Sequence, residues 1–369
     1  NSKVKKNKVA IDLSGGVDIA VSALLLKKSG YDLTGVYLKN FDIKSWLSGK
    51  KINEKIDSAC SSIVDQKHAE RVANFLDIPF YVLNLESEYK KYVFSKFIDG
   101  YKKGITPNPD VWCNTYIKFG KLLDFCKKID PESMLATGHY VRLRRTRSKI
   151  KDQISNIQIK DNKYHLLRGI DESKDQAYFL WQLTQEQLSK IIFPIGDLLK
   201  SQVREIAVKN KLPNALKKDS QGICFVGKLP VKEFLKSVIV PKVGDVVLPN
   251  GVKIGEHKGI YFYTIGERIN ASEIQNGKWK MQNQIQNSKL YSDHRKPLYV
   301  IEKNIKNNLL IVDYDEGQKP LWRNEFTVSD IHWISEAPKK DELLDIEIRY
   351  HQQPKSVGRI LEINNQKSK

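Results

Sequence analysis

The sequence contains no long hydrophobic run and few cysteines. Its apolar stretches, such as Ile19 to Leu26, fall well short of the roughly 18 residues of a membrane-spanning helix. Only four cysteines occur, at positions 60, 113, 126 and 224, and no two of them form a C-x-x-C pair. These absences exclude a membrane span, a disulfide-stabilised scaffold and a structural zinc site of the usual spacing. A folded protein of a reducing compartment fits best.

Acidic residues are few relative to basic ones. The 369 residues include 62 Lys and Arg against 43 Asp and Glu, a formal net charge of +19. This excess predicts an acidic partner, and composition alone leaves RNA, DNA and an anionic membrane surface open. Residues 3–8 and 142–151 form two basic segments without acidic residues. The alternative interpretation is that both segments are solvated surface.

The hydrophobic pattern of the first half predicts an α/β domain, which we place at residues 1–211. Short apolar runs typical of buried strands alternate there with segments of helical spacing. The predicted strands are 9–13, 33–38, 80–85 and 134–137, and the predicted helices are 19–28, 69–76, 89–98 and 116–126. This alternation is typical of a parallel sheet covered by helices on both faces.

The second half predicts β structure. Residues 212–291 combine glycine, lysine and short apolar runs, which indicates a small central β-rich domain. Residues 299–302 and 309–314 have the pattern of a hairpin, and residues 344–350 alternate apolar and polar side chains. Residues 292–369 are therefore predicted to form an antiparallel, β-barrel-like domain. Because a polar tail follows soon after a strand, truncation and divergence of this domain both remain open.

A glycine-rich turn follows the first predicted strand. In Ser14-Gly15-Gly16-Val17-Asp18, two glycines allow the backbone to approach a phosphate closely, and the start of the next helix favours an anion. The segment lacks both the G-x-x-x-x-G-K of the Walker loop and the G-x-G-x-x-G of dinucleotide binders. Its position at a strand end of an α/β sheet predicts a phosphate-binding loop.

Two further segments carry a candidate reactive cysteine. The prolines of residues 106–114 stiffen the chain, so Asp110 and Cys113 are predicted to lie on a rigid segment just ahead of a helix, where a thiol pKa is lowered. Residues 217–225 surround Cys224 with two lysines and a glycine, which predicts an exposed loop able to stabilise a thiolate or a persulfide. For either cysteine, the alternative is a small buried apolar residue.

Several of these segments together resemble the tRNA-specific 2-thiouridylases, PP-loop enzymes that place sulfur on position 2 of the wobble uridine. The resemblance covers nearly the whole chain, at residues 14–18, 35–40, 106–114, 136–140, 174–176, 222–225 and 263–266. It implies an N-terminal PP-loop domain of the adenine nucleotide alpha hydrolase-like, Rossmann-like type. The central domain would then carry the Cys224 loop and bind tRNA.

The resemblance also implies a mechanism. ATP with Mg²⁺ adenylates O2 of the uridine, and a persulfide on Cys224 then transfers sulfur to C2. Cys113 assists release of the sulfur and ends in a disulfide with Cys224, which an outside thiol reduces. Asp110 serves as general acid or base. A cysteine desulfurase or sulfur-relay protein would supply the sulfur, and tRNAs for Lys, Glu and Gln would be the substrates.

Binding residues follow from the same resemblance. The implied ATP-binding residues are Asp12, Leu13, Ser14, Gly15, Gly16, Val17, Asp18, Ile19, Leu38 and Gly138, with Asp18 beside the magnesium ion. The implied tRNA-binding residues are Asn108, Pro109, Asp110, His139, Lys174, Asp175, Gln176, Arg349 and Tyr350. For His139, the alternative is a structural histidine at a strand end. The basic segment 142–151 is expected to contact phosphates.

Three features depart from the family pattern. Ile19 replaces a serine of the PP-loop and so removes a hydroxyl donor, at a cost of about 1.5 to 3 kcal/mol for a hydrogen bond to a charged group. Glu267 stands where the family usually has glutamine, and the chain stops before a further tRNA-facing glutamine. Ile19 motivates one alternative, a tRNA-binding protein with impaired catalysis. Another PP-loop ATPase, such as an amide-forming ligase, would leave the paired cysteine loops unexplained.

The strongly basic composition and the segment 266–270 resemble the organellar members of the family. They predict a mitochondrial location, with the bacterial cytoplasm as the alternative. We expect a monomer.

Overall fold

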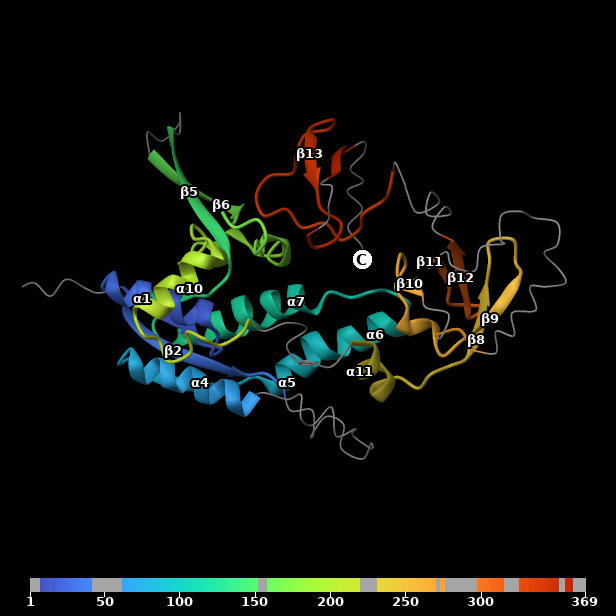
Figure 1. The fold of residues 1–369 in the computed structure, drawn as a ribbon. Helices are drawn as coiled ribbons and strands as arrows, with labels where there is room; N and C mark the ends of the chain where they lie inside the picture. Colours follow the sequence, from blue (N-terminus) through green and yellow to red (C-terminus); the bar gives the residue numbers. More distant parts are fainter. Residues whose placement is uncertain are drawn as a thin grey trace, which may run out of the picture.

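A computed structural model describes the chain in several stretches (Figure 1). The described residues are 7–41, 62–151, 158–219, 231–269, 273–275, 297–314, 325–351 and 356–360. Within these stretches, no helix has the length and apolar character needed to cross a membrane.

A five-stranded parallel sheet forms the centre of the N-terminal domain. Its strands follow the order β3-β2-β1-β4-β7, and each pairs in parallel with its neighbour. They are β1 (Lys8–Asp12), β2 (Asp32–Lys39), β3 (Phe80–Asn84), β4 (Met134–Ala136) and β7 (Ile191–Ile192). The predicted α/β class and parallel sheet are confirmed. Strand β7 was not predicted, because two residues carry no periodic pattern.

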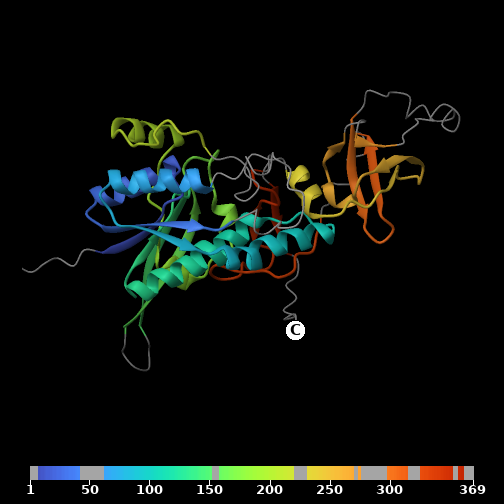
Figure 2. The same cartoon turned by 90° about the horizontal axis from the view of Figure 1, so that it is seen from below.

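Helices cover both faces of this sheet, as Figure 2 shows. One layer contains α1 (Val17–Lys28), α4 (Ser62–Phe75) and α10 (Lys200–Lys209). The other contains α5 (Glu86–Tyr89), α6 (Ser95–Lys102), α8 (Leu123–Ile129) and the π-helical segments η1 (Lys90–Phe94) and η2 (Cys113–Leu122). Val9 and Ile11 of β1 pack with the first layer, whereas Ala10 packs with the second. Successive side chains of β1 thus point to opposite faces of the sheet and belong to two separate hydrophobic cores.

The helix that carries Cys113 begins earlier than predicted. Helix α7 (Pro109–Trp112) runs directly into η2, so Asp110 and Cys113 lie inside the first turns and not ahead of the helix. The prediction of a stiff preceding loop was wrong because Asn108 caps the helix and Pro109 occupies its first turn, a position that suits proline.

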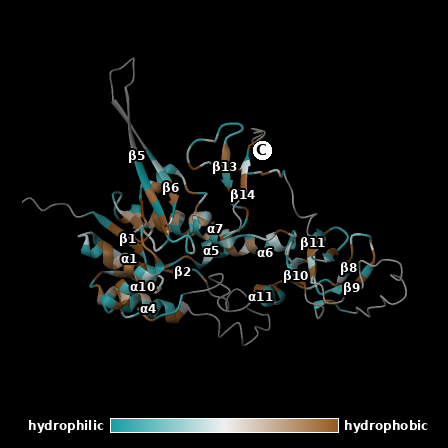
Figure 3. Cartoon of the chain, turned by 45° about the horizontal axis from the view of Figure 1, so that its top comes forward, coloured by the Kyte–Doolittle hydropathy of each residue, from teal (hydrophilic) through white to brown (hydrophobic). Residues whose placement is uncertain are grey.

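A long two-stranded ribbon leaves the sheet domain after β4. Strands β5 (Val141–Lys151) and β6 (Gln158–Arg168) pair antiparallel over their full length, and the ribbon projects from the body of the protein (Figures 1 and 2). The basic segment predicted at 142–151 is therefore strand β5. Its described part is mostly hydrophilic in Figure 3.

A second five-stranded sheet follows α11 (Val231–Val238), with the order β10-β11-β12-β8-β9. Its strands are β8 (Gly244–Val247), β9 (Lys253–His257), β10 (Arg268–Ile269), β11 (Leu298–Asn304) and β12 (Leu309–Tyr314). The predicted hairpin is confirmed as β11–β12, and β12 also pairs in parallel with β8. The sheet joins segments on both sides of the boundary predicted between residues 291 and 292. The boundary predicted after residue 211 stays a prediction.

The last described strands form a separate antiparallel pair, β13 (Leu343–Ile346) and β14 (Ser356–Arg359). Contacts between residues 325–351 and the sheet domain hold this part beside the ribbon. His332 Nε2 lies 3.0 Å from the carbonyl oxygen of Leu183, and Arg168 Nη2 lies 3.4 Å from Glu347 Oε2. Three short elements complete the description, η3 (Ala177–Phe179), α9 (Gln185–Leu188) and η4 (Ile260–Phe262).

Candidate active site

The glycine-rich loop lies at the carboxyl end of β1 and is held from two sides. Gly15 has φ +76°, and a Cβ atom there would lie 2.6 Å from the carbonyl oxygen of Asp65. Asn214 Nδ2 donates to the carbonyl oxygens of Gly15 and Gly16, at 3.1 and 2.9 Å. Lys217 Nζ also contacts the Gly15 oxygen, at 3.2 Å. Only glycine fits at position 15, and contacts from Asn214 and Lys217 hold the loop in place.

The start of helix α1 fits a phosphate. Gly16 precedes the helix, whose N-terminal amides and dipole favour an anion. Gly138, which follows β4, packs so closely that a Cβ atom would lie 2.9 Å from the Ile19 nitrogen. Leu13 and Ile19 are buried in the core, and Leu38 lies near the end of the neighbouring strand β2. The predicted ATP-binding residues therefore gather at one edge of the sheet.

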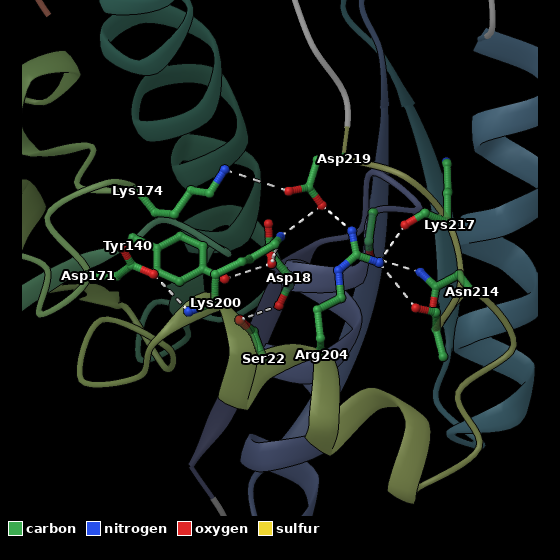
Figure 4. Close-up of polar contacts among 12 residues, drawn as sticks. Asp18, Ser22, Tyr140, Asp171, Lys174, Lys200, Arg204, Asn214, Lys217 and Asp219 are labelled. Carbon is green, nitrogen blue, oxygen red and sulfur yellow. Dashed lines mark hydrogen bonds and ion pairs between the residues drawn. The ribbon is translucent and has the colours of Figure 1, made fainter. Parts of the chain in front are cut away.

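The carboxylate of Asp18 is bound by two side chains from distant segments (Figure 4). Tyr140 Oη donates to Asp18 Oδ1 at 2.9 Å, and Lys200 Nζ lies 2.6 Å from the same oxygen. Burial, followed by the charge of Asp18, raises the pKa of Tyr140, so the phenol stays protonated and donates. Lys200 in turn contacts Asp219 Oδ1 at 2.9 Å, and Arg204 pairs with the same carboxylate.

An ion pair between a buried aspartate and a partly buried lysine connects the end of β1 to the helix that carries Cys113. Asp12, at the end of β1, is 5% exposed, and its Oδ2 lies 3.1 Å from Nζ of Lys118 on η2. Burial raises the pKa of Asp110, and the Lys118 charge opposes that rise. Burial and then the same charge hold the pKa of His139 well below its usual value. Lys118 thus links the phosphate-binding loop electrostatically to Asp110.

The two predicted catalytic cysteines differ in what the structure shows. Cys113 is 4% exposed and faces the core beneath the first turns of the helix. Cys224 lies outside the described residues, so its exposed loop and its approach to Cys113 stay predictions. Cys126 is buried, and burial raises its pKa to about 12. Its thiol is therefore part of the core.

Three segments meet around Asn108. Burial raises the pKa of Tyr178, and a contact with the Asn108 side chain opposes that rise. The Tyr178 hydroxyl donates to the Ile348 carbonyl at 3.0 Å. Arg349 Nη2 donates to the carbonyl of Ile265 at 2.7 Å. The Tyr350 ring lies with its centroid 4.4 Å from that of Phe179. The structure therefore brings together the predicted tRNA-binding residues of α7 and of the C-terminal part.

Tyr178 and Phe179 were not among the predicted residues. They follow the predicted segment 174–176 after one residue, Ala177, and this adjacency was the available sequence signal. Glu267, the second departure from the family pattern, accepts a hydrogen bond from the Thr264 amide at 2.8 Å and so closes the turn beside Arg349.

The remaining predicted tRNA-binding residues are largely occupied within the chain. Asp175 is 7% exposed, and its Oδ1 accepts from the amides of Gly169 and Ala177 at 2.9 and 3.2 Å. Gln176 Oε1 accepts from the Tyr140 amide at 3.1 Å. These contacts give both side chains a structural role, and their contact with tRNA stays a prediction.

Of the other two predicted tRNA-binding residues, His139 is buried within the chain and Lys174 is not. His139 is buried, with Nδ1 2.8 Å from Thr137 Oγ1, in keeping with the alternative of a structural histidine. Its ring also lies against Phe119 and Phe193. Lys174 is more exposed and lies 3.8 Å from Asp219 Oδ2. Of this group, Lys174 is best placed to meet a partner.

Comparisons with known proteins identify the family of the chain. Residues 7–228 match the family described as tRNA methyl transferase HUP domain, and residues 232–313 match the tRNA methyl transferase PRC-barrel domain. The second match spans the boundary predicted at 291, as the second sheet does.

Curated relatives match over most of the chain. The tRNA-specific 2-thiouridylase MnmA 1 of Geobacillus kaustophilus is 40% identical over 332 residues, which are 90% of this chain and 79% of that protein. The tRNA-specific 2-thiouridylase MnmA of Nitrosomonas europaea is 39% identical over 352 residues, 95% of this chain and 86% of that protein. The resemblance seen in the sequence is confirmed, and the chain belongs to the tRNA-specific 2-thiouridylase family.

Proposed function

We propose that the protein is an ATP-dependent 2-thiouridylase acting on the wobble uridine of tRNA. The observation that supports the proposal is the Asp12–Lys118 pair, because it joins the end of β1, just before the predicted phosphate-binding loop, to the helix that carries Asp110 and Cys113. A nucleotide bound at the loop and a base bound at the helix would then be close enough to react. The net charge of +19 supports a nucleic-acid substrate.

The reaction has three steps, and a reduction then regenerates the enzyme. The uridine O2 attacks the α-phosphate of ATP, and pyrophosphate leaves with the electron pair of the broken bond. The outer sulfur of a Cys224 persulfide then forms a bond to C2, and AMP leaves with O2. Finally, the Cys113 thiolate attacks the sulfur of Cys224, the S–S bond breaks, and its electron pair stays on the new C2 sulfur. An external dithiol reduces the resulting Cys113–Cys224 disulfide.

Asp110 has the properties of a proton carrier for this reaction. Its raised pKa makes the carboxylate a stronger base than an ordinary aspartate, so the group can accept the N3 proton of the uridine as O2 attacks ATP and return it after sulfur is bound to C2. The Asn108 cap fixes the turn on which it lies.

Magnesium would enter with ATP. In the described part of the chain, no group of three or more His, Cys, Asp or Glu side chains could hold a metal ion. Asp18 is the carboxylate at the loop, and its Oδ1 is already bound by Tyr140 and Lys200. The residues present therefore fit an ion held mainly by ATP phosphates, with Asp18 as its protein ligand.

The partners and the location belong to the same proposal. A cysteine desulfurase or sulfur-relay protein supplies the persulfide, and the substrates are the tRNAs for Lys, Glu and Gln. We place the protein in mitochondria, on its basic composition and on residues 266–270. Imaging of the full-length protein outside organelles would overturn this location.

The function is tested by mass spectrometry of tRNA nucleosides after incubation with the protein, ATP and a persulfide donor. We expect 2-thiouridine with the unaltered protein and none with Cys113→Ala or Cys224→Ala. Cys126→Ala is the matched control, because Cys126 lies farther along the same helix and in the core. Activity that survives loss of both Cys113 and Cys224 would refute the mechanism. Binding of tRNA without thiolation would instead support the alternative that Ile19 motivates.

A further inference from the structure

The ammonium group of Lys200 lies between two carboxylates beside the phosphate-binding loop (Figure 4). Its Nζ is 2.6 Å from Asp18 Oδ1 and 2.9 Å from Asp219 Oδ1, and the side chain is 14% exposed. The backbone amide of Lys200 donates to Asp171 Oδ2 at 2.9 Å, which fixes the start of α10. The lysine is thus held in one place by contacts at both of its ends.

Charged side chains of both signs surround Lys200. The Asp219 carboxylate lies near Lys200, Arg204 and Lys174. The Asp18 carboxylate also contacts Lys200. Burial opposes ionisation of Asp219, but the hydrogen bond and the charge of Lys200, with Arg204, lower its pKa. With Asp171, which accepts from the Lys200 amide, three cations and three carboxylates meet at the start of α10.

Among these cations, Lys200 is the one best able to exchange its partners. Arg204 also donates to the backbone oxygens of Ala215 and Lys217, and Lys217 is tied to Gly15 and Asp65. Lys174 lies farther from Asp219, at 3.8 Å. Both ion pairs of Lys200 Nζ are with carboxylates, which phosphate oxygens can replace as acceptors.

We propose that Lys200 binds the β- and γ-phosphates of ATP, and that Asp219 competes with these phosphates for its ammonium group. This inference rests on the proposed function and adds two residues to its nucleotide site. Asp18 belongs to the predicted phosphate-binding loop. Lys200 contacts Asp18 directly, so its ammonium group lies close to the predicted position of the phosphates. When the bond between the α- and β-phosphates breaks, Lys200 neutralises the charge that grows on the leaving pyrophosphate.

The proposal predicts opposite effects for its two residues. In titration calorimetry with the full chain and without tRNA, Lys200→Met weakens ATP binding by roughly 10-fold or more, the effect of losing a charged hydrogen bond. Binding of AMP, which lacks the β- and γ-phosphates, stays unchanged. Asp219→Asn strengthens ATP binding, because the competing carboxylate is gone. In the double variant Asp219→Asn has no further effect, since Asp219 acts through Lys200.

Lys190→Met is the matched control, because Lys190 contacts the Pro131 oxygen and Glu132 before β7, away from the loop. It should bind ATP as the unaltered protein does. The proposal would be overturned if the Lys200→Met protein bound ATP as tightly as the unaltered protein, or if it lost affinity for ATP and AMP equally. It would also be overturned if Asp219→Asn weakened ATP binding. The calorimetry contains no tRNA and is independent of thiolation. If both variants change ATP affinity as expected but the unaltered protein does not thiolate tRNA, the proposed function is refuted and this inference stands.

Discussion

Replacement of Asn108 separates helix capping from recognition of the target base. The Asn108 Oδ1 atom accepts from the amides of Asp110 and Val111, at 3.2 and 3.4 Å. Asn108→Ala removes all of these contacts at the start of the helix that carries Cys113. Loss of an N-cap of this kind typically costs about 1 kcal/mol, within a range of about 0.5 to 2.

Both Asn108 amide bonds are long, so we expect a loss near the middle of that range and not at its top. For a domain of this size, about 1 kcal/mol corresponds to a fall in Tm of about 2 to 4 °C. Asn108→Asp should keep the cap, because aspartate caps as well as asparagine and suits a helix N-terminus. If Asn108 also contacts the uridine, both variants lose thiolation although only the alanine variant loses stability.

The assay combines thermal unfolding with formation of 2-thiouridine. Asn74→Ala is the control, since Asn74 is exposed near the end of α4 and should change the free energy of unfolding by less than about 0.5 kcal/mol. An Asn108→Ala protein that unfolds at the same temperature as the unaltered protein would refute the capping role. An Asn108→Asp protein with full activity would refute the contact with the base.

Three further predictions address the loop, the ribbon and the proton carrier. Gly138→Ala should destabilise by about 1 to 3 kcal/mol and weaken ATP binding, seen in unfolding and calorimetry, because its Cβ would lie 2.9 Å from the Ile19 nitrogen. Glutamine at the exposed Arg144 and Arg145 should lower the salt-dependence slope of tRNA binding by about 2 and leave ATP binding intact; an unchanged slope means solvated surface. Asp110→Asn should raise Tm at neutral pH while abolishing thiolation. The raised pKa means that ionisation of Asp110 costs stability as pH rises through its folded value, so the gain should vanish below about pH 3.9.

The parallel sheet could be predicted because its strands are apolar runs between helices. Strands β1 and β2 are buried on both faces and carry a hydrophobic pattern that survives without tertiary context. The β5–β6 ribbon could not be recognised as strands, because residues 142–151 are dominated by charge. Its order comes from pairing with a second segment, which the β5 sequence does not contain.

The same distinction applies to the candidate site. The glycine loop and the Asn108 segment are local patterns of a few residues and were found from the sequence. Lys200 was missed because it reaches Asp18 across 182 positions, and nothing beside it in the chain indicates a site. Asparagine followed by proline is a typical start of a helix, so the sequence contained a signal for the cap at Asn108. The two prolines of the segment were instead interpreted as a stiff loop.

Ile19 changes the nucleotide site without removing it. Its side chain is 4% exposed and belongs to the core between the sheet and α1. A serine at this position would contribute one hydrogen bond to a charged phosphate, about 1.5 to 3 kcal/mol, whereas burial of an isoleucine contributes about 1.5 to 3 kcal/mol to folding. The exchange therefore trades phosphate affinity for stability in similar amounts. The helix amides and Lys200 remain as donors to the phosphates, so we expect Ile19 to weaken nucleotide binding without abolishing catalysis. This favours an active enzyme over a protein that only binds tRNA.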